Sequence, residues 1–262
     1  MHPNPAGAAP GDLVVSIGNV RMWEPDVGRA AAEIPITLSF PIGREIQVLW
    51  ELRPCAGTGC VTVGTDVAKP KVMVTPIRAG SGRAFVTIPI LGDDVVEGDE
   101  VLDVALVGVN DPMEQVAVSS DYAQGRLTVL DDDAAGFPSR FIAMGEVEAV
   151  EGDDDDGTPV IRTLGNPVTL GVPEGQDVFV EYTVDGGTAT PGVDFRTKQR
   201  LIQRIPAGHQ RAALLLPAVG DTEGEFDEYA TVHIHSVSNP LITVTADSGD
   251  MRILTDELPN PV

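Results

Sequence analysis

The chain is an internal duplication, and this feature limits its possible folds more than any other. Residues 64–67 recur in altered form at 192–195, and the acidic stretch 92–100 recurs at the same spacing as 220–228. Repeated segments at a constant spacing indicate tandem copies of one structural unit. We therefore predict two domains, unit one at residues 12–133 and unit two at residues 137–257. The linker between them is so short that it should place them end to end.

Each unit is predicted to consist of β-strands. Apolar and polar residues alternate in seven clear stretches: 34–40, 84–90, 101–106, 126–130, 178–184, 211–216 and 230–235. A period of two places one face of a strand in the core and the other in water. The 28 glycines and 21 prolines fit many turns between short strands. About seven strands per unit predict an all-β protein made of two tandem antiparallel β-sandwiches.

The charge of the chain is strongly acidic. Asp and Glu total 40 against 17 Lys and Arg, a formal net charge of -23. A nucleic-acid partner would need a basic stripe, and an anionic membrane surface would repel the chain, so we expect neither nucleic-acid binding nor membrane insertion. Cations remain as natural partners. Scattered carboxylates only keep a protein soluble, so the argument depends on where they cluster.

Four groups of acidic residues in unit one flank the strands instead of lying within them. They are Glu24; Asp66; the run Asp93, Asp94, Glu97 and Glu100; and the run Asp131, Asp132 and Asp133. Loops that are distant in sequence meet at the ends of a β-sandwich, so these carboxylates should converge. Converging carboxylates repel each other unless a cation neutralises them. Calcium, with about six to eight oxygen ligands, suits such a site better than magnesium or zinc.

Several of these stretches resemble a known family. Residues 93–100 resemble the signature of the Calx-beta domain, which occurs in sodium/calcium exchangers, an integrin subunit and many bacterial surface proteins. Residues 187–195 are similar to the second hallmark of that family, and residues 130–136 to its closing strand and acidic end. The resemblance covers nearly the whole chain, twice. It implies a seven-stranded immunoglobulin-like sandwich in each unit, with Ca²⁺ at the distal loops.

The resemblance also implies the metal ligands of unit two. Carried over position by position, they are Glu151, Asp194, Asp221, Glu225, Glu228, Asp256 and Glu257. In unit one it implies the acidic residues already named. Unit two departs from the pattern, because threonine stands at positions 222 and 255, where unit one has Asp94 and Asp131 as its repeat partners. We therefore expect unit two to bind calcium less tightly than unit one.

The only two cysteines, Cys55 and Cys60, replace a turn that unit two keeps at residues 185–189. The glycines between them would let the two β-carbons approach disulfide distance. The alternative is a pair of free thiols, whereas a zinc site would need more ligands than two cysteines supply. A disulfide would favour an oxidising location.

These features predict a calcium-binding structural or adhesive module of a cell-surface or virion appendage, with a protein partner in that assembly. Calcium would stiffen the domains and their junction. The alternative is a calcium-sensing regulatory module, as in the exchangers. The start of the chain shows no signal peptide, which fits a virion or cytosolic protein or a piece of an exported one. We expect no enzyme, because no nucleophile elbow or nucleotide-binding fingerprint occurs. His233 and His235 fit an exposed strand better than a zinc or catalytic site.

Overall fold

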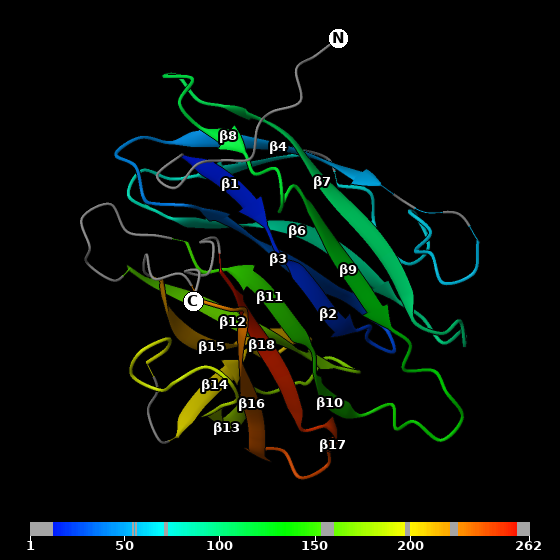
Figure 1. Ribbon diagram of the computed structural model, residues 1–262. Helices are drawn as coiled ribbons and strands as arrows, with labels where there is room; N and C mark the ends of the chain where they lie inside the picture. Colours follow the sequence, from blue (N-terminus) through cyan, green and yellow to red (C-terminus); the bar gives the residue numbers. More distant parts are fainter. Residues whose placement is uncertain are drawn as a thin grey trace.

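The computed structural model describes residues 13–53, 55, 57–70, 73–152, 160–196, 200–220 and 225–255. These residues form eighteen β-strands and no helix, which confirms the predicted all-β class (Figure 1). Within the same residues there is accordingly no helix long and apolar enough to cross a membrane.

The two units contain the same strands in the same order. Unit one has β1 (Val14–Ile17), β2 (Asn19–Trp23), β3 (Gly28–Leu38), β4 (Ile46–Arg53), β5 (Val74–Ile77), β6 (Arg83–Gly92), β7 (Glu100–Asn110), β8 (Ala117–Val118) and β9 (Gln124–Leu130). Unit two has β10 (Phe141–Met144), β11 (Glu146–Val150), β12 (Val160–Leu170), β13 (Val178–Gly186), β14 (Leu201–Ile205), β15 (Arg211–Gly220), β16 (Glu228–Val237), β17 (Thr243–Ala246) and β18 (Ser248–Leu254). The two halves of the described structure therefore share one order of strands.

Each unit is a sandwich of a four-stranded and a five-stranded layer. In unit one the layers are β6-β3-β1-β8 and β2-β9-β7-β4-β5, and unit two repeats them as β15-β12-β10-β17 and β11-β18-β16-β13-β14. The core lies between the layers, where Ile34, Ile88 and Val104 are fully buried. About seven strands were predicted per unit, whereas nine are found, because the first and last strands each divide between the two layers.

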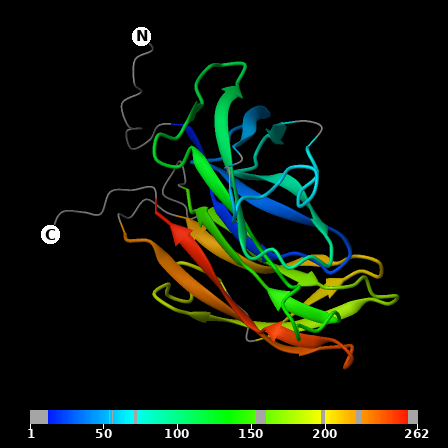
Figure 2. The ribbon, with the colours of Figure 1, turned by 90° about the vertical axis from the view of Figure 1, so that its right-hand side faces the viewer.

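The two five-stranded layers join edge to edge into one ten-stranded sheet. The joining strands are β2 and β11, which pair antiparallel in the register Arg21 with Glu146, Val20 with Val147 and Asn19 with Glu148. Figure 2 shows the strands of unit one, blue to green, lying directly against those of unit two, which run from green through yellow to red. The end-to-end arrangement expected from the short linker is therefore wrong: the units lie side by side.

Two glycines allow this close pairing. A Cβ atom at Gly18 would lie 1.9 Å from the carbonyl oxygen of Glu148, and one at Gly145 would lie 2.1 Å from the carbonyl oxygen of Arg21. These two glycines occupy equivalent positions in the repeat. The junction is thus close to twofold symmetric, and each unit presents the same edge to the other.

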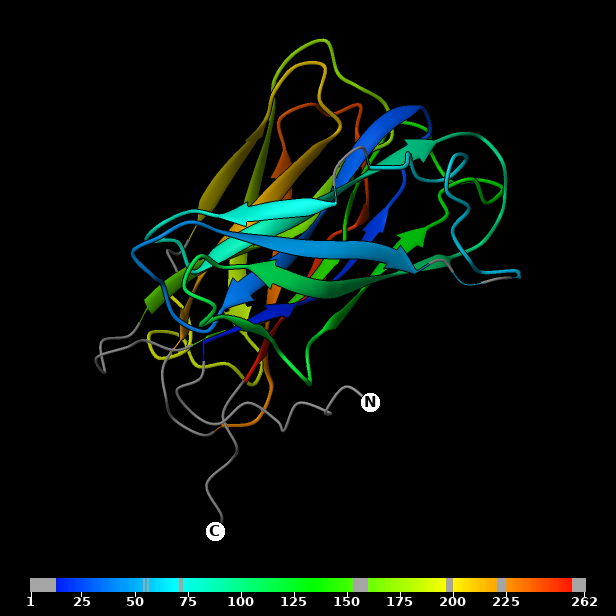
Figure 3. The same cartoon turned by 90° about the horizontal axis from the view of Figure 1, so that it is seen from above.

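Side chains on both sides reinforce the junction. The ring of Phe137 stacks on Trp23, with centroids 5.2 Å apart, and meets Phe141 edge-on at 5.0 Å. The Thr169 hydroxyl donates to the Trp23 carbonyl at 2.9 Å, and the Thr37 hydroxyl donates to the Val150 carbonyl at 3.0 Å. Seen from above, strands of one unit cross over those of the other (Figure 3). The sequence predicts that calcium stiffens the junction, but a junction that is loose without metal does not fit these contacts.

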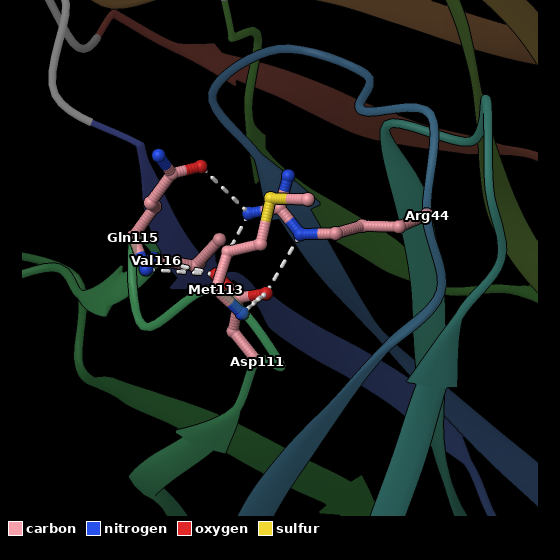
Figure 4. A network of polar contacts seen from close by, with 5 residues as sticks. All are labelled: Arg44, Asp111, Met113, Gln115 and Val116. Atoms are coloured by element: carbon pink, nitrogen blue, oxygen red, sulfur yellow. Dashed lines mark hydrogen bonds and ion pairs between the residues drawn. The ribbon is translucent and has the colours of Figure 1, made fainter.

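The loop after β7 shows how this protein satisfies a buried carboxylate without metal. Asp111 accepts hydrogen bonds from Nε and Nη2 of Arg44, both at 2.7 Å, and from the backbone N–H groups of Met113, Gln115 and Val116 (Figure 4). The Arg44 guanidinium holds the pKa of Asp111 well below its usual range. The other end of β7 carries carboxylates in a very different environment.

Candidate metal centre

The acidic loops of unit one meet at one end of its sandwich, beside the junction with unit two. Glu24 follows β2, and residues 131–133 follow β9. Because β2 and β9 pair in parallel, with Trp23 opposite Leu130, both strands end at the same place. The loop 93–99 joins β6 to β7 at this same end. The convergence expected from the sequence is therefore produced by strand pairing.

Three groups of carboxylates form in unit one, each with its oxygens within 4.8 Å of one another. They are Glu24 with Asp131 and Asp133; Asp26 with Asp132 and Asp133; and Asp66 with Glu97 and Glu100. The first two groups share Asp133. Asp131 connects the third, because its Oδ2 accepts the N–H groups of Glu97 at 3.1 Å and Gly98 at 2.8 Å. We call these eight residues acidic site one.

The most telling residue of acidic site one is Asp132. It is only 2% exposed, and neither of its carboxylate oxygens has a hydrogen-bond partner in the described structure. Oδ2 of Asp133 is likewise buried without a partner. Burying a carboxylate costs free energy unless hydrogen-bond donors or a cation compensate it. Unlike Asp111, then, Asp132 needs a proton, a cation or a water molecule to satisfy it.

The pKa values show the same unfavourable environment for ionised carboxylates. Burial, together with repulsion from Asp132 and Asp133, raises the pKa of Glu24 to about 9. Burial and the neighbouring Asp26 raise the pKa of Asp132 to about 8. Burial and Asp66 raise the pKa of Glu100 to about 7. A bound cation would favour the ionised forms and so remove the cause of these shifts.

Two predicted ligands lie at the edge of acidic site one. Asp93 uses its Oδ1 to accept the N–H of Val95 at 2.9 Å, and its charge adds to the repulsion that raises the pKa of Glu24. Asp94 is exposed, and it contributes to the raised pKa of Asp133. Neither residue belongs to one of the three groups.

Unit two contributes one group among the residues that the structure describes. Asp194, Glu225 and Glu228 lie within 4.8 Å of one another, and burial with the neighbouring Asp194 raises the pKa of Glu228 to about 8. Glu151 is buried but joins no such group. The remaining predicted ligands lie outside the described residues: Asp221, Asp256 and Glu257.

Around Glu151 the structure instead contains a buried guanidinium. Arg162 is 4% exposed and donates from Nη1 to the carbonyl oxygens of Glu151, at 2.6 Å, and Gly152. Its Nη2 donates across the junction to the carbonyl oxygens of Leu38 and Ser39. In unit one, Glu24 has Asp131 and Asp133 as neighbours.

Asp26 was missed by the sequence reasoning, although a signal for it was present. The pattern Glu-x-Asp occurs at Glu24 and Asp26, and again at Glu151 and Asp153. A second acidic residue that recurs with the first carries the same information as the other repeated acids. The longer acidic run 153–156 hid this repeat, because it resembled a solvated turn.

The donor set of all four groups consists of carboxylates alone, without histidine or cysteine. Oxygen-only ligands suit a hard cation, and the number of converging carboxylates fits calcium better than magnesium, which keeps most of its water. His233 and His235 take no part: His233 lies 3.6 Å from Asp185, and His235 contacts the hydroxyl of Thr183 at 2.8 Å.

Comparison with known proteins gives structural likenesses only. No family model matches the chain, and no curated protein matches its sequence. Among solved structures, the calcium-binding domain CBD12 of CALX1.1 is 16% identical, covering 91% of this chain and 99% of that one, with a TM-score of 0.38. The apo form of the Calx CBD1 domain is 20% identical, covering 45% and 99%, with a TM-score of 0.36.

A putative carbohydrate-binding protein from Bacteroides ovatus is 9% identical, covering 85% of this chain and 64% of that one, with a TM-score of 0.35. All these identities are below 25% and all these TM-scores are below 0.5. The fold therefore stands on the strand pairing alone, and the site on its own geometry.

Proposed function

We propose that this protein is a calcium-binding module whose principal ion site is acidic site one. The observation that carries the proposal is Asp132, a fully buried carboxylate with no protein donor, facing Asp26 and Asp133. Buried polar groups in proteins almost always have a partner, and a bound ion is one of the partners that can complete such a group. Calcium is the ligand whose charge and coordination number fit the surrounding oxygens.

The residues would form separate ion sites according to their positions. Glu24, Asp131 and Asp133 would hold one ion; Asp26 and Asp132 would hold a second, with Asp133 shared. Asp66, Glu97 and Glu100 would hold a third. In unit two, Asp194, Glu225 and Glu228 would hold another. Calcium supplies the positive charge that these oxygens lack, and its binding should release protons from the groups with raised pKa values.

We further propose a structural or adhesive role at a cell surface or on a virion, and a binding function instead of an enzymatic one. The rigid junction supports the structural role, because strand pairing already fixes the two units relative to each other. Calcium would then hold the loops that leave β2, β6 and β9 around that joint. The disulfide of unit one fits an oxidising location.

Thermal unfolding and calorimetry test this function. Free calcium at about a thousand times the dissociation constant should stabilise the protein by about 4 kcal/mol, and magnesium at the same concentration should stabilise it less. A structural module should bind tightly and keep its shape on loading. A sensor should instead bind reversibly near micromolar calcium and change shape. Equal melting temperatures in EDTA and in calcium would rule out the proposed function.

A further inference from the structure

The two cysteines of the chain form a disulfide that lies beside the third carboxylate group. Cys55 and Cys60 are bonded, with their Cα atoms 5.5 Å apart, which resolves the alternative left open by the sequence. The residues on either side of Cys60 are bonded to the start of β7: the Val101 N–H donates to the Gly59 carbonyl at 3.0 Å, and the Val61 N–H donates to the Val101 carbonyl at 3.1 Å. Val101 directly follows Glu100, a member of that group.

The same segment continues into the turn that carries Asp66. The carboxylate of Asp66 accepts the N–H of Thr62, while its own N–H donates back to the Thr62 carbonyl at 3.1 Å. Thr62 is two residues from Cys60. Two of the three carboxylates in the group, Asp66 and Glu100, are therefore connected to the chain next to Cys60, through Thr62 and Val101 respectively.

Unit two provides an internal comparison, because it makes the same turn without cysteines. There the Ala189 N–H donates to the Tyr229 carbonyl at 3.1 Å, and the Asp194 carboxylate accepts the Thr190 N–H. The turn is closed by a ring: a Cβ at Gly187 would lie 2.1 Å from a ring carbon of Tyr229. Unit one has Val101 at that position. The disulfide of unit one therefore occupies the place where unit two has Gly187 packed against the ring of Tyr229.

We propose that the Cys55–Cys60 disulfide is a positioning element for the Asp66, Glu97 and Glu100 group, so that cation binding at this group depends on the oxidation state of the two cysteines. The proposal rests on the proposed calcium function. Cys55 is exposed, so a soluble dithiol can reach it. The dithiol donates two electrons and two protons: the S–S bond breaks, two thiols form, and the dithiol closes into its own disulfide.

Calorimetric titration of the full chain with calcium, with and without dithiothreitol, tests the proposal. Reduction frees the loop, and we expect one class of sites to weaken about tenfold, equivalent to about 1.4 kcal/mol. The double variant Cys55→Ser with Cys60→Ser should bind as weakly as the reduced protein and should not respond to dithiothreitol. The variant Glu100→Gln, which disables this group, should lose the response to reduction while its remaining sites still bind.

Amide hydrogen exchange of the metal-free protein gives a readout that does not depend on calcium. Reduction should speed exchange at the Val61 and Val101 amides, and leave Ala189 in unit two unchanged. Calcium binding of equal strength in the oxidised and reduced protein would overturn the positioning role and leave the proposed function intact. Absence of calcium binding in both states would overturn both. Unchanged exchange at Val101 would likewise overturn the positioning role.

Discussion

Replacing Asp132 by asparagine should stabilise the metal-free protein and reduce the stabilisation that calcium adds. Asparagine keeps the shape of the side chain and removes its charge. In the metal-free protein, burial and Asp26 disfavour the ionised carboxylate, which has no donor. The amide has no charge and can donate a hydrogen bond to the Asp26 carboxylate, so the variant should stabilise the metal-free protein by about 2 kcal/mol, the order of a hydrogen bond to a charged group. The melting temperature should rise by roughly 4 to 8 °C.

With calcium the same variant should gain less stability than the unmodified protein gains. It offers the ion one negative charge fewer, and a tenfold loss of affinity would remove about 1.4 kcal/mol of the stabilisation by calcium. The assay is thermal unfolding of both proteins in EDTA and in millimolar calcium. The reasoning is refuted if the variant is less stable than the unmodified protein in EDTA, because Asp132 would then stabilise the fold by itself.

Asp111→Asn is the matched control. Asp111 is also buried, but it accepts hydrogen bonds from Arg44 and from backbone N–H groups, and its pKa is depressed. Its substitution leaves Arg44 without its anionic partner, so it should destabilise the protein equally in EDTA and in calcium. In EDTA, the change from Asp to Asn should therefore raise stability at position 132 and lower it at position 111. The difference arises because Asp111 has a cationic partner, Arg44, and Asp132 has none in the metal-free protein.

Three further outcomes are expected. The metal-free protein should lose stability as the pH rises from about 5 to about 9. The folded-state pKa values of Glu24, Asp132 and Glu228 are raised above their ordinary values, so these groups lose their protons in this range. Urea unfolding that gives constant or rising stability over this pH range would contradict the prediction. Small-angle X-ray scattering curves should be the same in EDTA and in calcium, because strand pairing fixes the junction. A larger radius of gyration in EDTA would instead show that calcium stiffens the junction. Gly145→Val should separate the units and increase the radius of gyration, whereas Gly43→Val, at a site open to solvent, should leave it unchanged. An unchanged radius of gyration for Gly145→Val would mean that the pairing of β2 with β11 does not hold the units together.

The strands were predictable because alternation of apolar and polar residues is a local signal. The alternating stretches 84–90 and 211–216 lie within β6 and β15. The division of the first strand between two layers was not predictable in this way, since β1 and β2 continue the same local pattern on either side of Gly18. Only the packing of both layers shows that the strand changes sheet there.

The candidate site was predictable in its composition and only partly in its grouping. The repeat and the runs of acids indicated Asp66, Glu97 and Glu100, which the structure brings together. The sequence did not indicate that Asp133 would be shared between two groups, nor that Asp26 would complete one of them. Those relations depend on β2 and β9 ending side by side, which no local pattern encodes.

The sequence by itself determined that the chain is a duplicated all-β protein with carboxylates gathered at strand ends, because periodicity, repeats and charge are written residue by residue. The tertiary structure alone decided that the two units share a ten-stranded sheet. That junction is made by backbone hydrogen bonds between β2 and β11, which have no side-chain signature, and by Gly18 and Gly145, whose missing Cβ atoms matter only once the other strand is in place. It also decided that Asp132 is buried without a donor, since burial is a property of the packed fold.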